Sequence, residues 1–347
     1  MTAPEELPGS LVRFAAKAAG LPENGFFATK LKGDASSRAY WRVARPGGPS
    51  FVAMVLPADA GRSEEASKGA PPPELPFLDV QRYLASRGVP VPAVHRVDLD
   101  AGLLLLEDLG DVTLEAAFTG GDARTRERLY GEAVDLLADI HARAEARPGG
   151  SVAFGRAFDF DLLRWEWDHY IEYGLLARTG RHPSPVQAAL LASEGDRICR
   201  TLAGLPRGFT HRDYQSRNLM VTPRGLVVLD FQDALLGPRP YDLVALLRDS
   251  YVELPEPLVD SLVARYLDRL GDRTAPEAFR RAFDLMAVQR KLKDGGRFEY
   301  IHRVKGNPSF LPHVPASLRH AARALARLPE HRPLLDLLRG FHPEMGA

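Results

Sequence analysis

Residues 211–231 read HRDYQSRNLMVTPRGLVVLDF, and this stretch decides the fold. Two short apolar runs flank a turn that has proline at its second position, Thr222-Pro223-Arg224-Gly225, which predicts an antiparallel hairpin. Asn218 immediately precedes the first run, and Asp230 immediately follows the second. These two positions lie side by side at the open end of such a hairpin. The pattern therefore brings together a carboxamide and a carboxylate, oxygen ligands of the kind that Mg²⁺ prefers.

A third polar residue, Asp213, lies five positions before Asn218 on the loop that enters the hairpin. The arrangement H-R-D-x-x-x-x-N followed by D-F is that of the kinase template. On this interpretation Asp213 is the catalytic base, while Asn218 and Asp230 hold a Mg²⁺ ion that bridges the phosphates of ATP. The alternative is that Asp213 and Asn218 cap a loop and Asp230 ends a strand, as Asp and Asn often do. Gln232, at the third motif position, replaces glycine and argues against a protein kinase with a movable switch loop.

The residues before this stretch predict a sheet with one helix. Two β-rich segments, 40–43 and 51–55, bracket the turn Pro46-Gly47-Gly48-Pro49. Apolar residues then recur at helical spacing from Phe77 until Gly88. Two further strands are expected at 94–97 and 103–106.

The residues after position 110 predict mostly helices. Apolar positions from Leu129 to Ile140 lie on one helical face. Similar patterns cover roughly 160–178, 185–203, 240–252, 257–270, 276–293 and 316–340. The stretch 209–231 alternates like strands in the midst of these helices. The fold class is therefore α+β.

Composition restricts the class of protein. The chain has 347 residues, 45% of them apolar, which is enough for a sizeable core. Lys+Arg and Asp+Glu are 45 each, so the formal net charge is zero and a nucleic acid is not expected as a partner. Cys199 is the single cysteine, which suits a reducing cytoplasm, and no apolar stretch is long enough to span a bilayer. We expect a cytoplasmic protein that binds small molecules and no membrane, and the kinase interpretation adds the expectation of a monomer.

The motifs HRDYQSRNLM, VLDFQDAL and GPRPYDLVALLRD resemble those of the aminoglycoside phosphotransferase and choline kinase superfamily. The resemblance covers about 33–315 and implies a protein-kinase-like fold of two lobes. It implies a small antiparallel-sheet N-lobe over 1–106, a hinge at 107–112 and a mostly helical C-lobe over 113–347. Residues 33–40 and the run FQDALLGPRPYDLVALLRDSYVELP are similar, more narrowly, to the bacterial anomeric kinases for N-acetylmuramate and N-acetylglucosamine.

The resemblance also implies roles for further residues. The loop from Gly33 through Ser36 and Ser37 to Arg38 resembles the turn that covers the phosphates of ATP, although an ordinary polar hairpin turn fits the same composition. Glu107 to Leu109 resembles the hinge segment whose backbone binds adenine. Asp242 resembles an aspartate that braces the catalytic loop, and capping of the following helix explains it equally well.

One expected residue is missing. Where a kinase strand carries V-A-I-K, this chain reads Val52-Ala53-Met54-Val55, without the lysine that would hold the α- and β-phosphates. Lys32, Arg38 and Lys68 are the candidates to replace it, and the sequence does not choose among them.

The acceptor pocket is expected in the helical lobe. Its candidates are Trp165 and Glu166, with Trp167, on one helix, and Arg297 and Lys305, with Tyr300, near the C-terminal end of another. An aromatic ring can stack on a sugar, and arginine or lysine can bind a carboxylate. Core packing of the tryptophans and solvation of the charges are the competing interpretations.

The resemblance therefore implies an ATP- and Mg²⁺-dependent kinase of the anomeric C1 hydroxyl of N-acetylmuramate and N-acetylglucosamine in cell-wall recycling. Two alternatives stay open. One is another small-molecule hydroxyl kinase, such as an aminoglycoside phosphotransferase, which would need an acidic pocket for a polycationic substrate. The other is a non-catalytic nucleotide-binding regulator, which the missing strand lysine would favour.

Overall fold

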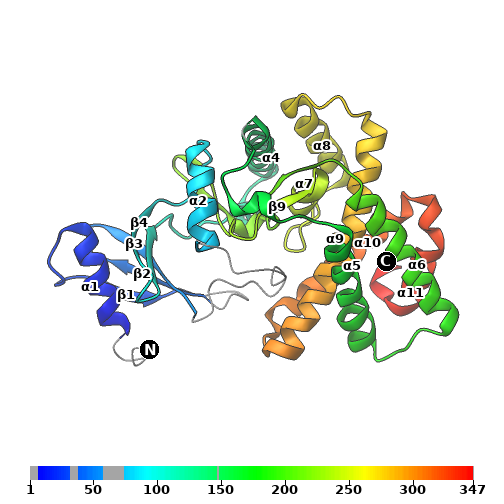
Figure 1. The fold of residues 1–347 in the computed structure, drawn as a ribbon, viewed down its shortest axis with the longest axis horizontal. Helices are drawn as coiled ribbons and strands as arrows, with labels where there is room; N and C mark the ends of the chain where they lie inside the picture. The colour runs from blue at the N-terminus through cyan, green and yellow to red at the C-terminus, as the bar shows by residue number, and fades with distance from the viewer. Residues whose placement is uncertain (1–6, 32–37, 58–73, 147, 347) are drawn as a thin grey trace.

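Both parts expected from the sequence are present in the computed structural model, which describes residues 7–31, 38–57, 74–146 and 148–346. Figure 1 shows the sheet with its helices at one end of the molecule and the larger helical part at the other. The fold is α+β, with an antiparallel-sheet lobe followed by a mostly helical lobe. The exact lobe boundaries, 1–106 and 113–347 with a hinge at 107–112, stay a prediction.

The first lobe is built on a five-stranded antiparallel sheet in the order β1-β2-β3-β5-β4. Its strands are β1 (Phe27–Lys30), β2 (Ala39–Ala44), β3 (Ser50–Val55), β4 (Val94–Asp98) and β5 (Leu103–Glu107). The predicted hairpin around the turn at 46–49 and the two later strands are thus confirmed.

Both faces of this sheet are covered by a helix, α1 (Leu7–Ala19) on one and α2 (Pro76–Ser86) on the other. The odd-numbered leucines of 103–106 pack in a cluster with Phe14 of α1, and the even-numbered ones pack with Val80 of α2. Successive strand residues point to opposite faces, so a run of four leucines is buried only when both faces are covered. The prediction of one helix in this lobe was wrong, because α1 adds a second.

The second lobe contains short strands among many helices. The helices are α3 (Leu114–Gly120), α4 (Ala123–Ala146), α5 (Phe160–His169), the π-helix η2 (Tyr170–Ala177), α6 (Pro185–Ala203), α7 (Pro240–Leu247), α8 (Glu256–Leu270), α9 (Pro276–Lys305), α10 (Val314–Ala326) and α11 (Arg332–Phe341). Short 3₁₀ turns lie at η1 (Val152–Gly155), η3 (Ser216–Asn218), η4 (Pro308–His313), η5 (Pro329–His331) and η6 (Pro343–Met345). Its two-stranded sheets pair β6 (Arg207–Thr210) with β9 (Leu235–Pro238) and β7 (Leu219–Thr222) with β8 (Gly225–Val228).

Three predicted helices end elsewhere in the structure. The pattern at 240–252 forms α7, which ends at Leu247. The pattern at 316–340 forms two helices, α10 and α11, because Pro329 and Pro333 lack the N–H that a continuous helix needs. The pattern at 276–293 forms α9, which continues to Lys305. The helix extends because the charged residues after position 288 are buried inside the lobe rather than marking an exposed end.

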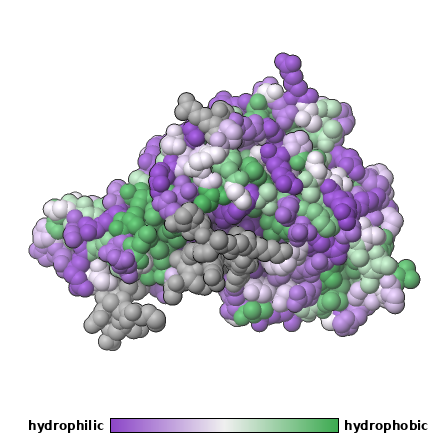
Figure 2. Space-filling view, viewed as in Figure 1, coloured by the Kyte–Doolittle hydropathy of each residue, from purple (hydrophilic) through white to green (hydrophobic). Residues whose placement is uncertain are grey.

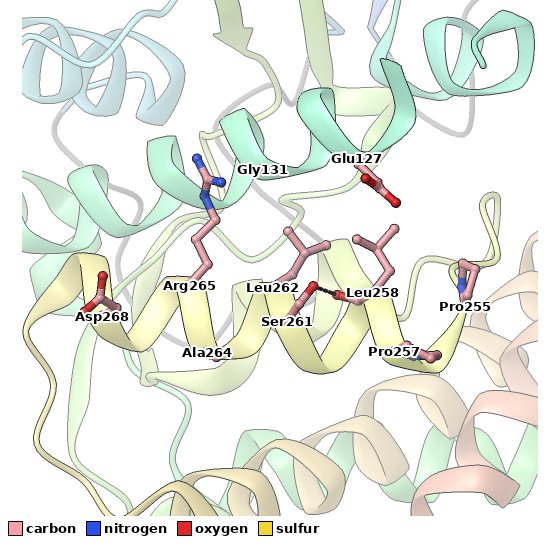
Figure 3. A pocket seen from close by; sticks show the side chains of 10 residues that line it. All are labelled: Glu127, Gly131, Pro255, Pro257, Leu258, Ser261, Leu262, Ala264, Arg265 and Asp268. Carbon is pink, nitrogen blue, oxygen red and sulfur yellow. Dashed lines mark hydrogen bonds between the residues drawn. The ribbon is translucent and has the colours of Figure 1, made fainter. Parts of the chain in front are cut away.

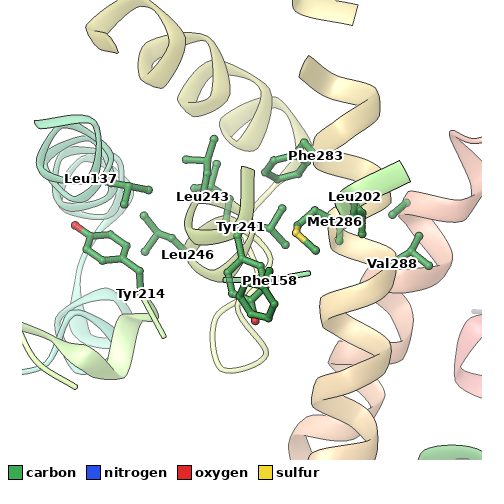
Figure 4. Close-up of a cluster of buried hydrophobic side chains, with 14 of the residues drawn as sticks. Leu137, Phe158, Leu202, Tyr214, Tyr241, Leu243, Leu246, Phe283, Met286 and Val288 are labelled. Carbon is green, nitrogen blue, oxygen red and sulfur yellow. The ribbon is translucent and has the colours of Figure 1, made fainter. Parts of the chain in front are cut away.

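The core of the second lobe anchors the segment that precedes the hairpin (Figure 4). Tyr214 has no exposed surface, and its hydroxyl donates a hydrogen bond to the Ala133 carbonyl of α4 at 2.9 Å. Its ring lies beside Leu137 of α4 and Leu246 of α7. Asp213 is the neighbour of Tyr214 in the chain, so this packing fixes the loop that carries the candidate base.

Cys199 and Trp167 both lie in the core, and for Trp167 the competing interpretation of core packing is the one that holds. Cys199 has no exposed surface, and burial raises the pKa of its thiol to about 12, which removes thiolate chemistry near neutral pH. Trp167 is 1% exposed and packs against Gly195 of α6, where a Cβ would lie 2.5 Å from the indole nitrogen. Trp167 is therefore a core residue and does not line an acceptor pocket.

His342 gives the fold a pH dependence. It is 1% exposed and lies 2.9 Å from the Tyr170 hydroxyl, and burial lowers its pKa to about 4. The unfolded chain then binds a proton at a pH where the folded chain does not, so acid lowers the free energy of unfolding. Between pH 7.5 and 5.5 this group alone removes about 1 kcal/mol. We expect urea unfolding of His342→Gln to lose about 1 kcal/mol less than the wild type over this range. An identical loss in both proteins contradicts the prediction.

The surface is predominantly polar. On the face drawn in Figure 2, hydrophilic side chains cover most of the helical lobe, and apolar ones gather beside the sheet. Single exposed apolar residues such as Phe27 and Leu99 are ordinary on a protein surface. Among the helices formed by the described residues, none combines the length and apolar composition needed to cross a membrane.

Candidate active site

The predicted hairpin is confirmed. Strands β7 and β8 pair antiparallel with Leu219 opposite Val228, and the turn lies between Thr222 and Gly225. At the open end the Leu229 N–H donates to the Asn218 carbonyl at 2.8 Å. Asn218 therefore directly precedes β7, and Asp230, which follows β8, lies beside it.

Asp213 is attached to the same end of the hairpin. The Asn218 side-chain Nδ2 donates to the backbone carbonyl of Asp213 at 2.8 Å, which closes the loop between them. The Asp213 carboxylate is partly exposed, with 30% of its side-chain surface accessible. The loop therefore presents a carboxylate to solvent while its backbone is held from within, which is the arrangement that a proton acceptor requires.

Asp242 braces this loop. Its carboxylate accepts from the backbone N–H groups of His211 at 2.6 Å and of Arg212 at 2.9 Å, and it lies 3.2 Å from His141 Nε2. Burial alone would raise the pKa of Asp242, but these hydrogen bonds and the nearby histidines hold it below its usual range. The two hydrogen bonds to the loop confirm the bracing interpretation. The capping alternative is wrong, because no side chain caps α7 at its first residues.

His211 connects the loop to the hairpin. Its Nδ1 accepts from the Asp213 N–H at 3.2 Å, so its Nε2 carries the hydrogen that bonds the Leu229 carbonyl at 2.9 Å. These two bonds fix the tautomer and link the residue before Asp230 to the residue that carries the candidate base. His211 and His141 are both buried and hydrogen-bonded within the protein, so their role is structural.

Asp230 is held in a strained backbone conformation, with φ of 61°. Such residues persist where the surroundings fix them, and they gather at functional sites. Its Oδ1 accepts from Gln232 Nε2 at 2.9 Å and lies 3.8 Å from Arg38 Nη1. Desolvation by the surrounding protein and the nearby carboxylate of Asp213 raise the pKa of Asp230, although part of its side chain stays accessible to solvent. The site thus collects negative charge that a cation would neutralise.

The residues fit a divalent cation of the Mg²⁺ type. Since Asn218 Nδ2 is used by the Asp213 carbonyl, its amide oxygen is the atom left for a metal. Asp230 keeps 41% of its side chain exposed and has a second carboxylate oxygen. Within the described ranges no group of three His, Cys, Asp or Glu side chains could hold a metal. A Mg²⁺ site of one or two protein oxygens completed by phosphates and water does not require such a group.

The first lobe supplies one candidate for the phosphates. Arg38 lies next to β2 and reaches across to Asp230 of the second lobe. Gly33, Ser36 and Ser37, as well as the alternative cations Lys32 and Lys68, lie outside the described residues. Of the three cations proposed to replace the strand lysine, Arg38 is the one that the structure describes, and it lies beside Asp230.

The expected hinge is fixed by ion pairs that the sequence did not indicate. The Glu107 carboxylate accepts a hydrogen bond from Arg224 of the hairpin turn at 2.7 Å. The Asp108 carboxylate accepts one from Arg42 Nε of β2, also at 2.7 Å. Leu109 follows half-buried. The Glu107 side chain is used in this way, and the contact of the 107–109 backbone with adenine stays a prediction.

The acceptor candidates fall into two groups. Trp165 is 38% exposed and stacks on His169, whose ring lies 5.1 Å from that of Tyr300. Arg297 and Lys305 both lie over this Tyr300 ring, at 4.9 and 6.0 Å. The structure thus gathers Trp165, Arg297 and Lys305 around one aromatic cluster between α5 and α9.

Glu166 lies apart from this cluster. It has no exposed surface, accepts from Gln289 of α9 at 2.7 Å and lies 3.4 Å from Arg212 Nη2. A side chain enclosed in this way cannot line a pocket, so Glu166 is a buried structural residue and not part of the acceptor pocket as predicted. Its partners lie 46 and 123 residues away, which a sequence pattern does not reveal.

Two further residues hold the site and were not predicted. Asp249 accepts from the N–H and the hydroxyl of Ser216, between Asp213 and Asn218, at 2.9 and 2.5 Å. Arg156 donates to the carbonyls of Gln232 at 3.0 Å and Ala234 at 2.9 Å, just after Asp230. Asp249 is the last residue of the motif GPRPYDLVALLRD, and this position was the signal that could have identified it. No sequence motif marks Arg156.

A groove of about 820 Å³ lies away from these residues, between α4 and α8 (Figure 3). Leu258 and Leu262 form its apolar floor, and Glu127 and Arg265 stand at its sides. Among the residues that the structure describes, none of the predicted site residues lines it.

Comparison with known proteins agrees with this geometry. Residues 28–283 match the model of the phosphotransferase enzyme family. The chain belongs to this family. It is 33% identical to N-acetylmuramate/N-acetylglucosamine kinase of Neisseria meningitidis, over 91% of each chain. It is 36% identical to the enzyme of the same name from Pseudomonas aeruginosa, over 88% of this chain and 86% of the relative.

Comparison with solved structures finds the same fold in other kinases. Choline kinase of Cryptosporidium parvum superposes with a TM-score of 0.64 over 94% of this phosphotransferase and 96% of the kinase. At 12% identity this likeness establishes the shared fold alone. The family assignment makes the chain a phosphotransferase that acts on a hydroxyl group.

Proposed function

We propose that this phosphotransferase uses ATP and Mg²⁺ to phosphorylate the anomeric C1 hydroxyl of N-acetylmuramate and N-acetylglucosamine in the cytoplasm, as a step of cell-wall recycling. The observation that carries the proposal is the closed loop of Asp213 and Asn218 beside Asp230 at the open end of one hairpin. The names of two relatives at 33 and 36% identity support the choice of sugar.

The chemistry follows from these positions. The Asp213 carboxylate accepts the proton of the C1 hydroxyl while the hydroxyl oxygen forms a bond to the γ-phosphorus of ATP. The bond between the γ-phosphorus and the oxygen of the β-phosphate breaks, and ADP is released. Asn218 and Asp230 are the residues that would hold Mg²⁺, which neutralises phosphate charge when bound. Arg38 supplies a cation from the other lobe, in place of the missing strand lysine.

The test is direct. Purified protein is mixed with ATP, Mg²⁺ and each sugar, and ADP release is followed together with the acid stability of the product. An anomeric phosphate is acid-labile, whereas a phosphate on any other sugar hydroxyl is acid-stable. No turnover with either sugar, or an acid-stable product, contradicts the proposed substrate.

We propose the aromatic cluster of Trp165, His169, Tyr173 and Tyr300 as the acceptor-binding face, with Arg297 and Lys305 beside it. An aromatic face stacks on a sugar ring, and a guanidinium binds the lactyl carboxylate that N-acetylmuramate carries and N-acetylglucosamine lacks. An aminoglycoside would instead meet these cations with its own positive charge. An aminoglycoside panel beside the two sugars separates these substrates.

Arg297 is therefore expected to select between the two sugars. In Arg297→Gln, KM for N-acetylmuramate rises about tenfold, as loss of one charge-assisted hydrogen bond predicts, while KM for N-acetylglucosamine stays within about twofold. The matched control is Arg303→Gln, on the same helix, whose guanidinium pairs with Glu299 at 3.2 Å. Steady-state kinetics with both sugars measure the two KM values. An equal rise in KM for both sugars contradicts a contact between Arg297 and the lactyl carboxylate.

A further inference from the structure

Arg290 of α9 is a fully buried arginine that reaches the catalytic loop. It has no exposed surface; its Nη1 donates to the Arg212 carbonyl at 2.8 Å, and its Nη2 lies 3.4 Å from Asp213 Oδ1. Its guanidinium lies 4.7 Å from the centre of the Tyr241 ring. An arginine stays charged in proteins, so burying one is costly unless its partners are charged or strongly polar. Here one of the partners is the candidate base.

The residue that Arg290 holds is itself strained. Arg212 has φ of 79°, a left-handed conformation that costs about 1–3 kcal/mol for a residue with a side chain. Its N–H is bound by Asp242 at 2.9 Å and its carbonyl by Arg290, so both backbone groups are held by charged side chains. Glu166, which approaches the Arg212 guanidinium, is held in turn by Gln289, next to Arg290 on α9. Arg212 thus keeps this conformation through contacts from α5, α7 and α9.

The same helix extends from the base toward the proposed acceptor face. Arg297 lies seven residues after Arg290, about 10 Å along α9 at 1.5 Å per residue. A single rigid element therefore carries both the side chain that contacts Asp213 and a side chain that faces the sugar. Sites built on one rigid helix keep the distance between their parts more constant than sites built on loops.

We propose that Arg290 is a positioning residue that fixes the Asp213 carboxylate in the orientation in which it accepts the proton of the acceptor hydroxyl. The inference rests on the proposed kinase function. Arg290 acts in two ways: its Nη1 fixes the turn at Arg212 from which Asp213 follows, and its Nη2 holds one carboxylate oxygen so that the other is free for the hydroxyl. Small displacements of a reacting group cost large factors in rate while leaving substrate binding intact.

The test compares three variants with the wild type. In Arg290→Gln we expect kcat to fall about 100-fold, with KM for ATP and for the sugar within about threefold, since neither substrate is bound by Arg290. Arg290→Lys keeps the charge but loses the planar fork whose two nitrogens reach the carbonyl and the carboxylate separately, so we expect kcat to fall about tenfold, less than in Arg290→Gln. The control is Arg280→Gln on the same helix, whose guanidinium pairs with Asp284 at 3.2 Å, and its kcat stays within about twofold.

The outcomes separate the inference from the proposed function. A kcat of Arg290→Gln within about threefold of wild type overturns the inference, as does an equal loss in Arg280→Gln. Thermal unfolding reports whether each variant is folded, and if Arg290→Gln is not, Arg290→Lys decides: a lower kcat at unchanged KM supports the inference, and a wild-type kcat overturns it. A wild type inactive on both sugars removes the proposed substrate, and the comparison then uses hydrolysis of ATP, with water as the acceptor.

Discussion

In Asp213→Asn, kcat for either sugar falls about 1,000-fold, because the amide cannot accept the proton that the C1 hydroxyl loses. A factor of this size corresponds to about 4 kcal/mol of transition-state stabilisation. The substitution keeps the shape of the side chain and leaves the backbone carbonyl that Asn218 binds, so the loop is expected to stay in place. Initial rates at saturating ATP and sugar measure the effect.

Nucleotide binding distinguishes this result from unfolding. Asp213→Asn is expected to bind ADP with Mg²⁺ as tightly as the wild type, since Asp213 is assigned to the acceptor and not to the metal. Asp135→Asn, which loses an exposed ion pair of α4 with Arg265, serves as the control and keeps wild-type kcat. Equal trace rates in wild type and Asp213→Asn would instead favour the nucleotide-binding regulator.

The residues of the hairpin could be predicted because their relation is local. Asn218 and Asp230 flank two strands joined by a two-residue turn, so pairing of the strands places them together whatever surrounds them. In the first lobe the hairpin of β2 and β3 was predictable for the same reason, because its two strands and their turn are adjacent in the sequence, whereas β3 pairs with β5 across the segment that holds α2. The α1 helix was missed although Leu11, Phe14 and Ala15 have helical spacing, because its packing surface is the far face of a sheet formed later in the chain.

The buried charges of α9 could not be predicted in this way. A run such as Gln289-Arg290-Lys291 on a helix is usually solvated, and only its partners explain why it is buried here. Arg290 pairs with residues 77 and 78 positions earlier, and Gln289 with Glu166, 123 positions earlier. One signal was available: residues 285–288 are all apolar, which indicates a helix buried on every side and predicts that the charges following it are enclosed too.

In Asp230→Asn, kcat also falls about 1,000-fold, but for a different reason, because the site loses the carboxylate that would hold the cation against the phosphates. The two variants are therefore controls for one another. Adding Mg²⁺ tightens ADP binding to the wild type and to Asp213→Asn, whereas in Asp230→Asn it changes the Kd little. Titration calorimetry with and without Mg²⁺ measures the difference. If Mg²⁺ tightens ADP binding equally in all three proteins, the Asp230 carboxylate does not hold the metal, and its assignment as a ligand is wrong.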